Sequence, residues 1–238
     1  MKRFALVILL PVLLLYGCYR LSYPRYVWHE RLELVVQTPE GEKRGAAVIL
    51  SRRSITPKTL PDASVIGGGI EGEATMVDLG GGRYLFALLK GRDGLVSQVF
   101  HDRLPRDARP RALIGALAAL RAKAPVPPEY YPLLVTFGDI NDPASVRRVD
   151  PADLAATFGA GFALREITLE VTDDAVTEGV IEGVLGAWLN MVKGRAPSDA
   201  RDIPALHLPN DSPRGWVNLG ALSFWSLDTV MELKEKYK

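Results

Sequence analysis

The strongest constraint on the fold is an alternation of apolar and polar residues that runs into a tight turn. Over residues 26–37, Leu32 and Leu34 fall on one side of an extended chain, and charged neighbours fall on the other. Turn-forming residues occupy positions 38–41, and an apolar stretch follows over residues 45–53. The pattern predicts an antiparallel β-hairpin.

A second hairpin is predicted over residues 73–90. Three consecutive glycines at positions 80–82 separate its two apolar segments. Residues 84–89 are apolar at every position, which is typical of a central strand covered on both faces.

A third alternating segment covers residues 162–172. Its apolar face carries Leu169, and its other face carries Glu166, Thr168 and Glu170. Paired carboxylates can act as an acid and a base, but a solvated outer face explains these glutamates more simply. We therefore predict a strand with Leu169 buried and Thr168 exposed.

Helical spacing is clearest over residues 109–124, where Leu113, Ile114, Leu117 and Leu120 form an apolar stripe, Pro110 suits the first turn and Pro125 ends the run. Further predicted elements are a helix over residues 176–192, a polar loop over residues 194–215 and a charged terminal helix over residues 228–238. Residues 125–132 form a proline-rich connector that is a possible sub-boundary. The sequence predicts an α+β fold over residues 19–238, in which antiparallel β-hairpins form a sheet with a few packed helices behind an N-terminal hydrophobic signal or anchor.

The N-terminal segment has the layout of a signal peptide: Met1, Lys2 and Arg3 precede an uncharged stretch over residues 4–19. A membrane-spanning helix needs about 20 apolar residues, so a cleaved signal is favoured over a permanent span. The end of the stretch, Leu15-Tyr16-Gly17-Cys18, resembles the lipobox of bacterial lipoproteins. The resemblance implies that residues 1–18 are the signal peptide and that Cys18 is lipidated.

Tyr16 departs from the lipobox pattern, which has a smaller residue there. The alternative is therefore an uncleaved transmembrane helix, with Tyr19, Tyr23, Tyr26 and Trp28 as an interfacial aromatic belt. In the lipoprotein interpretation, Tyr19 stands where Asp signals retention in the inner membrane. We therefore expect a cell-envelope location, with the periplasmic side of the outer membrane favoured and an inner-membrane anchor as the alternative.

Composition narrows the classes of partner. Lys plus Arg total 29 and Asp plus Glu total 28, and this balance argues against a nucleic-acid partner. Cys18 is the only cysteine, so the chain forms no internal disulfide. His29, His101 and His207 lack the spacing of metal ligands. We expect no metal and no cofactor.

Two glycine clusters resemble nucleotide-binding motifs. Residues 67–72 fit the pattern G-x-G-x-x-G, but a predicted strand follows where a dinucleotide site needs a helix. Residues 78–82 resemble the phosphate loop of actin and Hsp70-type ATPases, although Arg83 departs from that family's pattern. We expect a flexible loop in the first case, a tight hairpin in the second, and no nucleotide ligand.

No catalytic motif supports an enzyme. The sequence has no G-x-S-x-G elbow, and none of Ser51, Ser54, Ser64 and Ser97 stands beside a feature that suggests a base. Because catalytic groups can also come together from distant positions, enzymatic activity stays uncertain.

Three segments look like parts of uncharacterised bacterial exported proteins. They are the hairpin over residues 26–49, the glycine turn with Arg83, and residues 148–151 before Leu154. The resemblance implies no activity. We expect an envelope-tethered, lipoprotein-like binding or structural protein, held at the membrane by its N-terminal lipid or helix and with a possible envelope protein partner. The alternative is a periplasmic hydrolase whose site is assembled from distant residues.

Overall fold

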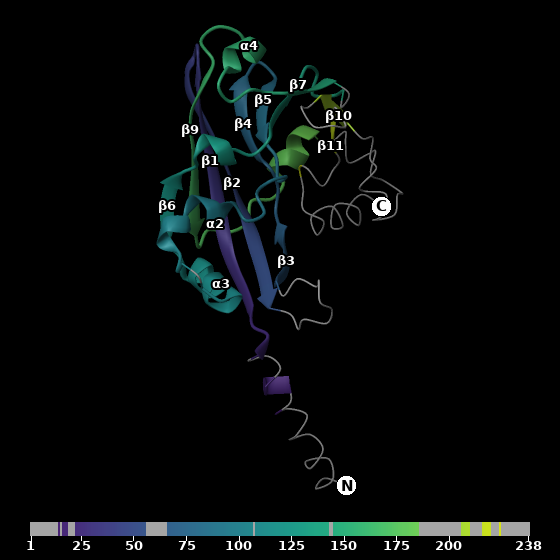
Figure 1. Cartoon of the computed structure of the whole chain (residues 1–238). Helices are drawn as coiled ribbons and strands as arrows, with labels where there is room; N and C mark the ends of the chain where they lie inside the picture. Colours follow the sequence, from purple (N-terminus) through teal and green to yellow (C-terminus); the bar gives the residue numbers. More distant parts are fainter. Residues whose placement is uncertain are drawn as a thin grey trace, which may run out of the picture.

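A computed structural model describes residues 22–55, 66–106, 108–142, 145–185, 206–209 and 216–219, together with 14, 16–18 and 224. This part of the chain consists mainly of antiparallel β-sheets with few helices. Figure 1 shows its longest strands side by side along the molecule, with α3 (Pro110–Ala119) toward one end and α4 (Leu154–Phe158) toward the other.

The larger sheet has five strands in the order β3-β2-β1-β9-β6, and all their pairings are antiparallel. Alternating side chains give β1 a buried face, as a half-covered sheet requires. Its strands are β1 (Arg25–Thr38), β2 (Gly41–Ile55), β3 (Ile66–Glu71), β6 (Ala122–Pro125) and β9 (Ala163–Thr172).

The smaller sheet has four strands in the order β4-β5-β7-β8, again antiparallel. Its strands are β4 (Thr75–Gly80), β5 (Arg83–Ala87), β7 (Leu134–Phe137) and β8 (Val146–Arg148). A separate hairpin pairs β10 (Leu206–Pro209) with β11 (Trp216–Leu219).

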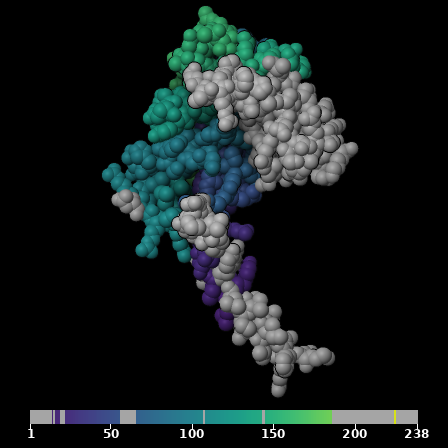
Figure 2. Space-filling view, turned by 45° about the vertical axis from the view of Figure 1, so that its right-hand side comes forward, coloured from purple at the N-terminus to yellow at the C-terminus, as the bar shows by residue number. Residues whose placement is uncertain are grey.

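The helices are short connectors. α2 (Leu95–Val99) is followed by the 3-10 turn η1 (His101–Arg103), and η2 (Pro128–Tyr130) lies between β6 and β7. Residues 180–185 are also helical. Figure 2 places the start of the large sheet, in purple, at the opposite end of the molecule from the green residues around α4.

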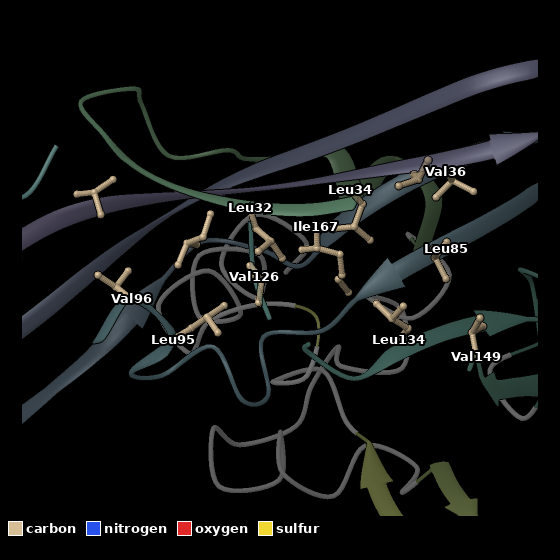
Figure 3. Close-up of a cluster of buried hydrophobic side chains, with 14 of the residues drawn as sticks. Leu32, Leu34, Val36, Leu85, Leu95, Val96, Val126, Leu134, Val149 and Ile167 are labelled. Carbon is tan, nitrogen blue, oxygen red and sulfur yellow. The ribbon is translucent and has the colours of Figure 1, made fainter. Parts of the chain in front are cut away.

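One buried apolar cluster contains residues from both sheets. Leu32 and Ile167 come from the larger sheet, Leu85 and Leu134 from the smaller one, and all are almost completely buried. Figure 3 shows these side chains converging between the strands, with α2 contributing Leu95. Burial of this apolar surface is the main stabilising contribution to the fold.

The two sheets come into backbone contact at Gly45. A Cβ atom added at this residue would lie 1.9 Å from the carbonyl oxygen of Met76 in β4. No side chain fits there, so the close approach of β2 to β4 requires glycine.

The structure confirms both predicted hairpins. β1 pairs with β2 through the turn after Thr38, and β4 pairs with β5 through the glycine turn. β5 is central, as expected, because it lies between β4 and β7. Leu117 and Leu169 are buried at 6% and 0% exposure, as their positions in the predicted stripes require.

Four expectations are wrong in detail. The helix predicted to reach residue 124 ends at Ala119, and residues 122–125 instead pair with β9. Pairing with a neighbouring strand overrides the local preference for a helix there. Thr168 is only 7% exposed, so the outer face of β9 is partly covered. The predicted loop over residues 194–215 contains β10.

The fourth correction concerns the first glycine cluster. Residues 67–69 are not a loop but part of β3, where they pair with residues 52–54 of β2. A Cβ atom at Gly68 would lie 2.0 Å from the carbonyl oxygen of Arg52, so glycine allows β3 to approach β2. A pattern of side chains cannot reveal a strand that has almost none.

Most of the predicted signal segment lies outside the described residues, as do residues 186–192 and 228–238 of two predicted helices. Cys18 itself is described and exposed. Among the described residues, no helix combines the length and apolar character that crossing a membrane requires.

Candidate ligand-binding pocket

The buried face of β1 carries one acidic residue among apolar ones. Trp28, Glu30 and Leu32 alternate with more exposed neighbours, and all three are at most 6% exposed. A carboxyl group on this face has lost its hydration, and such groups are normally held by hydrogen bonds or an opposite charge. The hydrogen bonds and charges around Glu30 therefore show how its buried carboxyl group is stabilised.

One oxygen of the Glu30 carboxyl group is fully engaged. Its Oε1 atom accepts a hydrogen bond of 2.7 Å from the indole Nε1 of Trp28 and one of 2.6 Å from the hydroxyl of Ser51. Ser51 lies directly opposite Trp28 in the β1–β2 register, so the two strands fix both donors. The other oxygen, Oε2, is buried without a hydrogen-bond partner.

A buried arginine lies beside Glu30 and contacts its backbone. Arg92, in the loop between β5 and α2, is 0% exposed, and its Nη2 donates a 3.3 Å hydrogen bond to the backbone oxygen of Glu30. Its Nε and Nη1 atoms have no partner. Glu30 and Arg92 thus bring opposite charges into one buried layer and leave polar atoms on both sides unsatisfied, which is costly in a folded protein.

Burial shifts both groups toward their neutral forms. Desolvation raises the pKa of Glu30, whereas the hydrogen bond from Ser51 and the charge of Arg92 act against this rise. Desolvation also lowers the pKa of Arg92 to about 10, against the charge of Glu30. Arg92 therefore remains a cation at neutral pH.

Glu30 borders a pocket between the inner face of the larger sheet and helices α2 and α3. Its volume is about 140 Å³, and most of its wall is apolar. The polar residues of the wall are Glu30, Arg53 and Ser97. The full lining is Trp28, Glu30, Arg53, Ile66, Gly94, Val96, Ser97, Leu113, Ile114 and Leu117.

Arg53 holds one wall of the pocket in place. Its guanidinium lies 5.8 Å from the centre of the Trp28 ring, within the range of a cation–π interaction. The same group forms an ion pair with Asp93 and donates a 3.3 Å hydrogen bond to the carbonyl oxygen of Gly69. Its donors are therefore already committed to protein acceptors.

A wider hollow of about 530 Å³ lies over β1, β2 and β3. Arg25, Val27 and Arg52 contribute to its wall, and Arg52 forms an ion pair with Glu71. The wall of this hollow is more polar than that of the Glu30 pocket, so the hollow gives weaker support for an apolar ligand.

A second buried glutamate has a structural role. Glu73 accepts hydrogen bonds of 3.0 Å and 3.2 Å from the backbone N–H groups of Val180 and Ile181 at the start of the 180–185 helix. Burial raises its pKa, and these two hydrogen bonds oppose the rise. A carboxylate placed there satisfies the first amides of the helix.

The sequence singled out several other residues that the structure keeps apart. His29 lies in β1 and His101 in η1, and His207 lies in β10, where its side chain is not described. Within the described residues, no three His, Cys, Asp or Glu side chains gather as a metal site would require. Glu166 is exposed and Glu170 is half-buried on β9.

Both nucleotide-like glycine clusters form β-structure. The first is β3, and β4 rather than a helix follows it. The second closes the β4–β5 turn, where Asp78 accepts a 2.8 Å hydrogen bond from the amide of Gly80. That the glycines do not bind a nucleotide stays a prediction.

Glu30 itself was not found from the sequence, although a signal was present. The alternation of β1 extends back from Leu32 through Glu30, Trp28 and Tyr26, which places a carboxyl group in an apolar stripe. Arg92 gave no comparable signal because it lies in a loop.

Comparison with known protein families, with curated proteins and with solved structures finds no match to this chain.

Proposed function

We propose that this chain is a non-enzymatic binding protein of the bacterial cell envelope: an α+β domain tethered by its N-terminal segment and carrying a small-molecule pocket. The tether is inferred from the lipobox-like Leu15-Tyr16-Gly17-Cys18, and the outer membrane is its favoured location. The binding role is supported above all by the mostly apolar pocket of about 140 Å³ whose wall includes the buried Glu30.

The form of the pocket is the reason to expect a ligand. Apolar pockets with a few polar groups are the usual form of ligand sites. The Glu30 pocket has this form, because its wall is mostly apolar and its polar residues are Glu30, Arg53 and Ser97.

The test is whether an apolar ring enters this pocket. The full chain, isotope-labelled and held in lipid nanodiscs, is dialysed against a common reservoir of toluene so that the free toluene concentration is fixed. We expect a saturable shift of the Trp28 indole N–H resonance, because Trp28 lines the pocket.

A pair of matched variants locates the binding. Leu113→Phe enlarges a side chain of the pocket wall and should abolish the shift. Leu120→Phe adds the same volume at the C-terminal end of α3, outside the pocket wall, and should preserve it. Absence of saturable toluene binding to the unaltered chain would refute the binding role.

The hydrolase alternative has one supporting observation. Glu30 and Ser97 line the same pocket. However, the hydroxyl of Ser97 donates a 2.6 Å hydrogen bond to the carbonyl oxygen of Gly94, so its proton is directed away from any base. Hydrolysis of p-nitrophenyl acetate that is lost in Ser97→Ala would favour the hydrolase over the binding protein.

A further inference from the structure

We infer that the end of the domain next to the tether lies against a surface of anionic phospholipid, held there by exposed arginines and by the exposed apolar side chains beside them. This inference rests on the proposed membrane tether and adds which face of the domain the membrane contacts. It follows from the place where the chain enters the sheet, the cations at that place and the distribution of exposed apolar residues.

Three elements meet where the N-terminal segment joins the domain. β1 begins there at Arg25. α3 packs beside it, since a Cβ atom at Gly115 would lie 3.6 Å from the ring of Tyr26. β3 begins there as well, because Ile66 pairs with Ile55 at the end of β2. Figure 1 shows α3 and β3 on opposite sides of β1 near its start. We call α3, the starts of β1 and β3 and the end of β2 the tethered end.

The tether keeps this end close to the membrane. Cys18 precedes Arg25 by seven positions, and an extended chain spans at most about 3.6 Å per residue, so Arg25 stays within about 25 Å of the proposed lipid. The first acidic residue of the chain is Glu30, and Arg20 and Arg25 lie between it and Cys18. Basic residues next to a membrane anchor are attracted to anionic lipids.

The tethered end carries uncompensated positive charge. Arg25, Arg109 and Arg111 are exposed, and no residue that the structure describes forms an ion pair with them. The acids Glu71 and Asp93 are each paired with another arginine, from β2. The formal net charge of the whole chain is only +1, so the positive charge is concentrated locally. Such a surface is complementary to an anionic one.

Exposed apolar side chains gather at the same end. The large apolar residues that are exposed in the described part of the chain are Leu14, Tyr16, Val27, Ile66 and Val180. The first two belong to the N-terminal segment, and the next two begin β1 and β3. Apolar side chains among cations suit the boundary between lipid head groups and acyl chains.

The wider hollow over β1, β2 and β3 gives a head group room at this end. Arg25 and Arg52 in its wall are cations, and Val27 lies between them in the sheet, directly opposite Arg52. Gly68 and Gly69 also line the hollow and have no side chains to fill it. Arginine binds phosphate oxygens through two parallel hydrogen bonds, so the polar wall that disfavours an apolar ligand suits a phosphate.

The test measures how near α3 lies to the lipid head groups. The full chain, isotope-labelled, is placed in nanodiscs of phosphatidylcholine alone or with an equal part of phosphatidylglycerol, and each nanodisc includes a trace of lipid with a nitroxide on its head group. We expect strong relaxation enhancement of the Ala112 amide in the anionic nanodiscs and weak enhancement in the zwitterionic ones. In about 1 M NaCl, where the Debye length falls to about 3 Å, the enhancement in anionic nanodiscs should be lost.

Matched double variants locate the attraction. Arg109→Gln/Arg111→Gln removes two cations of the tethered end. Each arginine near an anionic surface strengthens binding about fivefold, so the ratio of docked to undocked domain should fall about 25-fold. Arg147→Gln/Arg148→Gln makes the same change of charge on exposed residues of β8, shortly before α4 at the other end of the molecule, and should leave the ratio unchanged.

The outcomes separate this inference from the proposed function. Equal enhancement in both kinds of nanodisc, or enhancement that persists in Arg109→Gln/Arg111→Gln, would overturn the inferred contact while leaving the tether intact. If Arg109→Gln/Arg111→Gln does not fold, the salt titration of the unaltered chain decides the same question. Release of the unaltered chain from the nanodiscs in about 1 M NaCl would refute the tether itself, because a lipid or an apolar helix is not displaced by salt.

Discussion

Leu169 is the side chain whose truncation tests the arrangement of the larger sheet most directly. It is 0% exposed in β9, where it pairs with Leu32 of β1 on one side and Ala124 of β6 on the other. Leu169→Ala removes three carbon groups, which costs about 2.4 kcal/mol at about 0.8 kcal/mol each. Strands on both sides prevent the site from collapsing, so the residual cavity raises the total to about 3–5 kcal/mol.

A urea titration of the full chain in mild detergent measures this loss as a change in the free energy of unfolding, and a thermal melt measures it as a change in Tm. For a domain of this size the loss corresponds to a fall in Tm of about 10 °C. Glu166→Ala, on an exposed position of the same strand, should change stability by less than about 0.5 kcal/mol. Thr168→Ala should lie between them, at about 1 kcal/mol, because Thr168 is buried. Equal losses for Leu169→Ala and Glu166→Ala would refute the register of β9.

Three further predictions address other parts of the chain. Cys18→Ser should abolish fatty-acid labelling in cells and leave an unprocessed precursor; unchanged labelling would contradict lipidation at this residue. Gly45→Ala should destabilise the chain by about 3 kcal/mol in the same urea assay, because its Cβ would lie 1.9 Å from the oxygen of Met76; a neutral effect would show that β2 and β4 do not meet there. Because burial raises the pKa of Glu30, its protonated form favours folding, so its contribution is present below the ordinary glutamate pKa of about 4.3 and is lost as pH rises through the raised value. Glu30→Gln should therefore lose less stability than the unaltered chain as pH rises above about 4.3, and an unchanged pH dependence would contradict this assignment.

The sequence by itself determined the local elements whose residues have a period. The alternation around Leu32 and Leu34 predicted β1, the turn after Thr38 predicted its pairing with β2, and the alternation around Leu169 predicted β9. In each case the physical reason is the same. Side chains alternate across a strand, so burial of one face imposes a pattern that can be read from one segment alone.

Only the tertiary structure decided the elements whose residues do not follow the alternation of a half-buried strand. Residues 122–125 follow helical spacing and yet pair with β9, and the glycine-rich β3 has no side-chain period to read. The pocket depends on contacts across long sequence separations: Glu30 from β1 meets Ser51 from β2 and Arg92 from a loop. A sequence shows that Glu30 interrupts an apolar stripe, but the partners of a buried charge are set by the packing of distant segments, because desolvation and hydrogen bonding act through space.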